Sequence, residues 1–134
     1  MRKLRILLVS SRLTYMPDNY FELYQNLLEL RSDFIYGFVL LDNLDKKSFF
    51  QSLGLYLLGA KNISKQLVRN MISLPLKKRE KLFEKYNIPT MSWDSMNTKD
   101  AIDYVKKNKI DIIVNLRTRC IYKSKILKAP KIGC

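Results

Sequence analysis

The sequence predicts an α/β fold, an open and mostly parallel sheet with helices on both of its faces. Two observations carry this prediction. Four short apolar runs have the length of buried strands, and segments with the three-to-four-residue periodicity of helices separate them. Strands that alternate with helices along a chain form parallel sheets, because each helix returns the chain to the same end of the sheet. A length of 134 residues fits a single domain.

The first half of the chain supplies two of these strands and a helix between them. Residues 4–11 form a near-continuous apolar run, which is typical of a parallel strand covered on both faces. We expect Asn19 to be the N-cap of the following helix, with Glu22 as its capping-box partner. Residues 34–41 form the second apolar run, and a turn at Asp42-Asn43 is expected to end it.

A helical insertion is predicted at about residues 46–76. Its apolar residues recur every three or four positions, with Gly54 and Gly59 as candidate breaks and Pro75 at the end. The members of this stripe are Phe49, Leu53, Tyr56, Ala60, Ile63, Leu67, Met71 and Leu74. The stretch is too short and too interrupted by Lys and Arg for a membrane span. Three interpretations fit: a helix or helix pair packed on the sheet, a helix in a membrane interface, or a partner-binding helix.

The second half of the chain repeats the strand–helix–strand pattern. Residues 77–86 predict a short charged helix, and residues 90–93 predict the third strand. Asn97 is the expected N-cap of the next helix, with Asp100 at its third position. Residues 111–116 form the fourth apolar run, which we expect to lie beside the first strand at the centre of the sheet.

The composition limits the chemistry that the chain can perform. The formal net charge is +13, which reflects either a basic compositional bias or a face that binds a polyanion. The chain has no His, which excludes imidazole-based nucleophile pairs and His-ligated zinc. Cys120 and Cys134 are the only cysteines, too few for a four-thiolate zinc site, so we expect no metal site. Without a secretion signal they predict reduced thiols and a cytoplasmic location.

Ligands of parallel α/β sheets bind beyond the carboxyl ends of the strands. Ser10, Ser11 and Arg12 follow the first strand without a Gly-x-Gly-x-x-Gly pattern, so they do not indicate a dinucleotide site. They are either ordinary polar loop residues or contacts for an anionic group.

The last third of the chain resembles the folate-dependent formyltransferase family. The resemblance rests on three linked segments: Asn87-Ile88-Pro89-Thr90, residues 111–116, and the string from Ile126 through Pro130 to Gly133-Cys134. It implies a Rossmann-like sheet. The chain stops at Cys134, before the family's catalytic Asn and His, so the resemblance implies a truncated N-terminal formyltransferase domain over residues 1–134 and no catalytic residues in it.

The resemblance also implies a cofactor and its site. The cofactor of the family is 10-formyltetrahydrofolate, and the loop after the fourth strand frames its pocket. By position, the cofactor-binding residues are Leu116, Arg117, Thr118, Arg119, Cys120 and Ile121. Two positions depart from the methionyl-tRNA formyltransferase pattern, since Thr118 stands where Gly is common and Tyr122 where Pro is common. From its residue type alone, Cys120 also fits a small buried apolar residue.

Three functions follow as expectations. The first is the N-terminal part of a formyltransferase-like protein whose amine substrate is an aminoacyl-tRNA or a nucleotide-linked amino sugar, with this chain itself inactive. The second is a non-catalytic α/β module that binds a polyanion such as nucleic acid or a phosphorylated ligand. The third is a membrane-surface or partner-docking protein that works through residues 49–74. We also expect self-association through an uncovered edge of the fourth strand.

Overall fold

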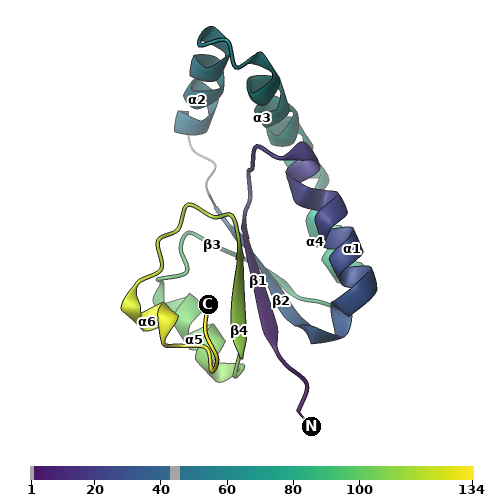
Figure 1. The fold of residues 1–134 in the computed structure, drawn as a ribbon, viewed down its shortest axis with the longest axis vertical. Helices are drawn as coiled ribbons and strands as arrows, with labels where there is room; N and C mark the ends of the chain where they lie inside the picture. Colours follow the sequence, from purple (N-terminus) through teal and green to yellow (C-terminus); the bar gives the residue numbers. More distant parts are fainter. Residues whose placement is uncertain (1, 43–45) are drawn as a thin grey trace.

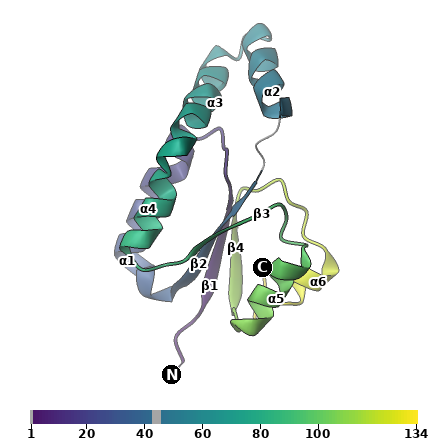
Figure 2. The same cartoon turned by 180° about the vertical axis from the view of Figure 1, so that it is seen from behind.

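In the computed structural model, which describes residues 2–42 and 46–134, the core is a sheet of four parallel strands (Figures 1 and 2). The strands are β1 (Ile6–Ser11), β2 (Ile35–Leu41), β3 (Thr90–Trp93) and β4 (Ile112–Leu116). Their order is β3-β2-β1-β4, so the chain builds outward from β1 in one direction and then returns to its other side. The predicted α/β class and the parallel sheet are confirmed.

The predicted adjacency of the first and fourth strands is correct, but the central position of the fourth is not. Ile6 pairs with Ile112 and Ser10 with Leu116, so β4 runs parallel to β1 over its whole length. Outside β4, the described chain contributes only a bridge between Ile112 and Gly133. An apolar run indicates that the side chains of a strand are buried, but it does not indicate that both edges of the strand are paired. For this reason the sequence wrongly predicted a central position for β4, which is an edge strand.

One face of the sheet is covered by α5 (Lys99–Lys107) and α6 (Ser124–Leu127) (Figures 1 and 2). Ala101 and Val105 of α5 and Ile126 of α6 are fully buried against side chains of all three strands β1, β2 and β4. The predicted cap of α5 was wrong by one residue: Thr98 is the N-cap, and its hydroxyl accepts a hydrogen bond from the Ala101 amide at 3.3 Å.

The opposite face is covered by α1 (Phe21–Arg31) and α4 (Lys78–Lys85). Three aromatic rings form the centre of this core, with Phe38 of β2 stacked on Phe83 at 4.0 Å between centroids and Tyr24 against both. All three side chains are fully buried. Such pairs contribute beyond the area they bury, because offset and edge contacts suit the ring quadrupoles.

Asn19 is not the N-cap that the sequence predicted for α1. A 3-10 turn, η1 (Pro17–Tyr20), precedes the helix, and Tyr20 is the N-cap. Asn19 is buried with φ 52°, and its Oδ1 accepts hydrogen bonds from the amide and hydroxyl of Thr14. Its short polar side chain therefore closes the loop after β1 instead of starting the helix.

The predicted insertion forms a helical hairpin of α2 (Lys46–Leu57) and α3 (Lys61–Ser73), which extends beyond the carboxyl ends of the strands (Figure 1). Gly59 breaks the helix with φ 85°, whereas Gly54 lies within α2. The interpretation that this segment packs on the sheet was wrong, because α2 packs mainly on α3 and α3 on η1. The predicted turn at Asp42-Asn43 falls partly outside the described residues.

The outer edge of β4 is covered only at its start. The Ile113 amide donates to the Gly133 carbonyl at 3.0 Å, and the Ile132 amide donates to the Asp111 carbonyl at 2.8 Å. Val114 and Leu116 beyond them line an open apolar groove between β4 and α1. Self-association through this edge therefore stays a prediction. In the part of the chain that the structure describes, no helix is long and apolar enough to cross a membrane.

Candidate anion-binding site

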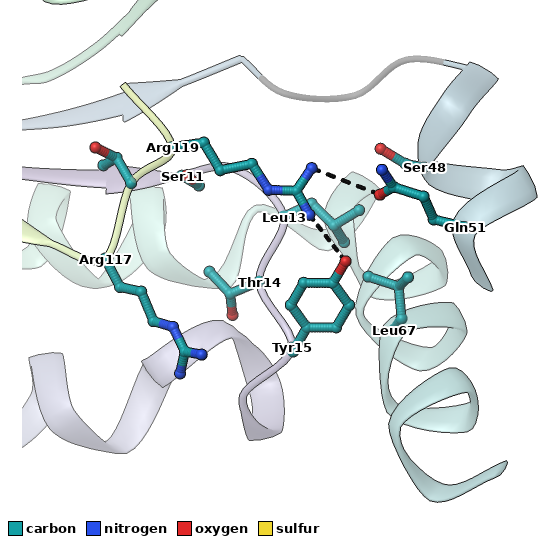
Figure 3. A pocket seen from close by; sticks show the side chains of 10 residues that line it. Ser11, Leu13, Thr14, Tyr15, Ser48, Gln51, Leu67, Arg117 and Arg119 are labelled. Carbon is teal, nitrogen blue, oxygen red and sulfur yellow. Dashed lines mark hydrogen bonds between the residues drawn. The ribbon is translucent and has the colours of Figure 1, made fainter. Parts of the chain in front are cut away.

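The candidate site is a cavity of about 290 Å³ at the carboxyl ends of β1 and β4 (Figure 3). These strands flank the point at which the strand order reverses, where ligands of open α/β sheets bind. The loop after β1, the loop after β4 and the hairpin together form its wall. The lining residues are Ser11, Leu13, Thr14, Tyr15, Ser48, Gln51, Leu67, Arg117, Thr118 and Arg119.

The loop after β4 is bent sharply where it meets the cavity. Arg117 has φ 55°, a left-handed conformation that L-residues other than Asn and Asp avoid. The Thr118 amide donates to Asn115 Oδ1 at 3.0 Å, which closes the turn. Arg117 is exposed and has no hydrogen-bond or ion-pair partner among the described residues, so its guanidinium is available to a ligand.

Arg119 is held in place by contacts from two other elements. Its guanidinium donates to the hydroxyl of Tyr15 at 2.9 Å and to Gln51 Oε1 at 3.5 Å (Figure 3). The guanidinium carbon also lies 5.9 Å from the centre of the Tyr15 ring. Since neither partner carries a negative charge, these contacts orient the cation without neutralising it.

The loop after β1 is fixed by a buried arginine. Arg79 of α4 donates to the carbonyl of Ser11 at 3.0 Å and to that of Arg12. Only 4% of Arg79 is exposed, and this burial lowers the pKa of its guanidinium from the usual value. From the hairpin, Asn70 donates to the carbonyls of Thr14 and Met16 at 2.7 and 2.8 Å. The cavity wall is thus tied to both the body and the hairpin.

The charged side chains that line this cavity are all positive. Two guanidinium groups line it, and no carboxylate stands among its lining residues. Arg12 is turned away, because it pairs with Glu80 at 3.7 Å and donates to Ser92 at 2.7 Å. Two arginines with adjacent hydroxyl groups are the donor set that phosphate and carboxylate groups prefer.

A second cavity, of about 240 Å³, shares Ser11 and Arg119 with the first. Asp42 and Asp94 line it, so its charge is mixed. Its loop is held by Asn97, which donates to the Ile121 carbonyl and accepts from the Lys123 amide, both at 2.8 Å. Asn97 therefore positions this loop and does not cap α5 as the sequence predicted.

The six residues that the resemblance assigned to the cofactor do not share one cavity. Arg117, Thr118 and Arg119 line the first, whereas Cys120 and Ile121 line the second together with Arg119. Leu116 points into the apolar groove beside α1. Cys120 is half-buried, with its Sγ 3.3 Å from the Ser95 hydroxyl oxygen.

Of the three residues that the sequence placed after the first strand, Ser11 lines the first cavity, whereas Ser10 is buried in β1 and Arg12 pairs with Glu80. Sequence reasoning missed Tyr15, Gln51 and Arg79. Each of them acts through a hydrogen bond to a residue that is 104, 68 and 68 positions away in the sequence, respectively. A local sequence pattern cannot predict such contacts.

Among the described residues, no group of three or more His, Cys, Asp or Glu side chains is arranged to hold a metal ion. Comparison of the chain with protein-family models, with curated proteins and with solved structures finds no match.

Proposed function

We propose that this chain is the ligand-binding α/β part of a formyltransferase-like protein and that its first cavity holds an anionic group of the ligand. The observation that carries the proposal is the pair Arg117 and Arg119, which lie without a carboxylate at the point where the strand order reverses. An anion placed there receives charge-assisted hydrogen bonds from both guanidinium groups.

The formyltransferase assignment adds the identity of the ligands. 10-Formyltetrahydrofolate carries carboxylates, and an aminoacyl-tRNA or a nucleotide-linked amino sugar carries phosphates, so each candidate offers an anion to the arginines. The second cavity, with Asp42 and Asp94, suits the opposite charge of an amine. The all-parallel sheet agrees with the Rossmann-like fold that the resemblance implies.

Binding, and not catalysis, is the role proposed for the chain's own residues. The chain contains no His, and the first cavity contains no carboxylate to accept a proton. We therefore expect no formyl transfer from 10-formyltetrahydrofolate to an amine by the 134-residue chain. Turnover that disappears in Arg119→Gln would contradict this division of roles.

Calorimetric titration with pyrophosphate and with 5-formyltetrahydrofolate, a stable analogue of the cofactor, tests the site. Replacing both arginines, in Arg117→Gln/Arg119→Gln, should weaken binding by on the order of a hundredfold, since each charge-assisted bond contributes about tenfold. The matched control is Lys106→Gln/Lys107→Gln, which removes the same charge from the exposed end of α5. Equal losses in the two variants would show that binding follows net charge and not the cavity.

A non-catalytic polyanion-binding module is the second candidate, favoured by the cluster Arg117, Arg119, Lys123 and Lys125, whose members are all exposed. Binding of single-stranded nucleic acid by this cluster should weaken steeply with salt, and each removed cation should reduce the slope by about 0.7. Preference for pyrophosphate and folate over a long polyanion favours the first candidate, and the reverse preference favours the second.

A further inference from the structure

The α2–α3 hairpin buries polar side chains between its helices and exposes most of its apolar side chains, whereas most helix pairs do the opposite. Ser52 and Ser64 face each other between the helices, with their hydroxyl oxygens 3.2 Å apart and Ser64 donating to the Ser52 carbonyl at 2.8 Å. The only buried apolar side chain of residues 46–73 is Leu67. The apolar side chains of the hairpin therefore lie mostly on its outer surface and not between its helices.

The outer surface of the hairpin concentrates the exposed apolar side chains of the protein. Residues 46–73 hold nine of the sixteen large exposed apolar side chains among the described residues. These nine are Phe49, Phe50, Leu53, Tyr56, Leu57, Leu58, Ile63, Val68 and Ile72. A concentration of this kind marks an interaction surface, because isolated exposed apolar residues are normally scattered.

Charge decides which partner suits this surface. Residues 46–73 contain five cationic side chains and no carboxylate. The five are Lys46, Lys47, Lys61, Lys65 and Arg69, and all are exposed. On α3, Lys65 and Arg69 line an apolar groove of about 530 Å³ together with Val68 and Ile72. A second copy of the same face would bring ten cations together, whereas an anionic lipid surface matches both the charge and the apolar side chains.

We propose that the α2–α3 hairpin docks this protein on the surface of a membrane that contains anionic lipid. The turn between the helices, at residues 58–60, lies at the end of the hairpin far from the sheet (Figure 1). Leu57 and Leu58 there are 77% and 85% exposed, and they enter the boundary between headgroups and acyl chains. The cations of both helices lie against lipid phosphates. The residues that dock the hairpin do not line the first cavity, so their substitution leaves the lining of the cavity unchanged.

Cosedimentation of the full chain with vesicles of phosphatidylcholine and phosphatidylglycerol at 7:3 tests the proposal. We expect binding to these vesicles that is at least about tenfold stronger than to pure phosphatidylcholine and that weakens as salt is raised. Leu57→Ser/Leu58→Ser should weaken binding by at least about tenfold, since two exposed leucines leave the lipid. Lys65→Gln/Arg69→Gln should weaken it by on the order of fivefold per cation.

Matched controls carry the same substitutions outside the hairpin. Leu30→Ser/Leu127→Ser and Lys106→Gln/Lys107→Gln alter residues that are also exposed, and both should bind vesicles within about twofold of the unchanged chain. Equal effects in hairpin and control variants would overturn the proposal, as would no binding to the mixed vesicles. If light scattering shows a dimer that Leu57→Ser/Leu58→Ser dissociates while vesicles are ignored, a second copy covers this face and the proposal is wrong.

Discussion

The sheet with its four covering helices, α1, α4, α5 and α6, is the body of the molecule, and it differs from the α2–α3 hairpin in what it buries. The body buries apolar side chains in two clusters, one on each face of the sheet. The hairpin buries Ser48, Ser52, Ser64 and Asn70 and exposes phenylalanine and leucine. The body therefore folds around water-excluded cores, whereas the hairpin is held by hydrogen bonds and leaves its apolar area for another surface.

The largest expected effect is a contrast between two phenylalanines. Phe38→Ala removes a fully buried ring that stacks on Phe83, so we expect the free energy of unfolding to fall by about 3–5 kcal/mol. Phe50→Ala removes a ring that is 66% exposed on the hairpin, and we expect a change below about 0.5 kcal/mol. Urea unfolding of the two variants measures both. A large loss in Phe50→Ala would mean that the hairpin's outer face is covered in solution.

The next effect concerns Arg79, a charged side chain that the body buries. Arg79→Met leaves the carbonyls of Ser11 and Arg12 without their donor, so we expect a loss of about 2–3 kcal/mol in the free energy of unfolding. Lys81→Met, two residues further along on the exposed side of α4, is the matched control and should stay within about 0.5 kcal/mol. Equal behaviour of the two variants would show that Arg79 is not needed to fix the loop after β1.

The body of the fold was predictable because its strands and helices have local signals. The apolar runs at residues 4–11 and 34–41 contain the strands β1 and β2, and the charged segment 77–86 contains α4. The helices of the hairpin were predictable for the same reason, but the prediction that they pack on the sheet was wrong. The apolar residues of the hairpin keep helical spacing, and spacing reports a face without saying what covers it. The serines between α2 and α3 carry no periodic signal that distinguishes them from surface residues.

Part of the candidate site was likewise predictable from the sequence, and part of it was not. Arg117, Thr118 and Arg119 were predictable from their position after a strand, since loops at the carboxyl ends of a parallel sheet gather at one edge. The position of Cys120 and Ile121 in another cavity was not predictable, because it depends on the hydrogen bonds that Asn97 makes with Ile121 and Lys123.

The third effect tests the hydrogen bonds that hold the hairpin. Ser64→Ala removes the hydroxyl that donates to the Ser52 carbonyl, so we expect α2 and α3 to lose about 1 kcal/mol of stability against local opening. Hydrogen exchange of the α3 amides measures this opening. Ser124→Ala, at an exposed serine of α6, should leave those amides unchanged. Unchanged exchange in Ser64→Ala would mean that apolar contacts, and not serines, hold the helices together.

The smallest effects concern the two glycines of the hairpin. Replacing each by alanine should change the stability of the hairpin in opposite directions. An added Cβ meets no atom within 4 Å at either Gly54 or Gly59, so neither substitution changes packing. Gly59 has φ 85° in the turn between α2 and α3, and Gly59→Ala should destabilise the hairpin by about 1 kcal/mol. Gly54 lies inside α2, where alanine is the better helix former, and Gly54→Ala should stabilise the hairpin by about 0.5–1 kcal/mol. Hydrogen exchange of the hairpin amides gives both signs. Because Gly54→Ala touches nothing in the isolated chain, a loss of stability there would show that another surface already packs against α2 in solution, and the difference between hairpin and body would disappear.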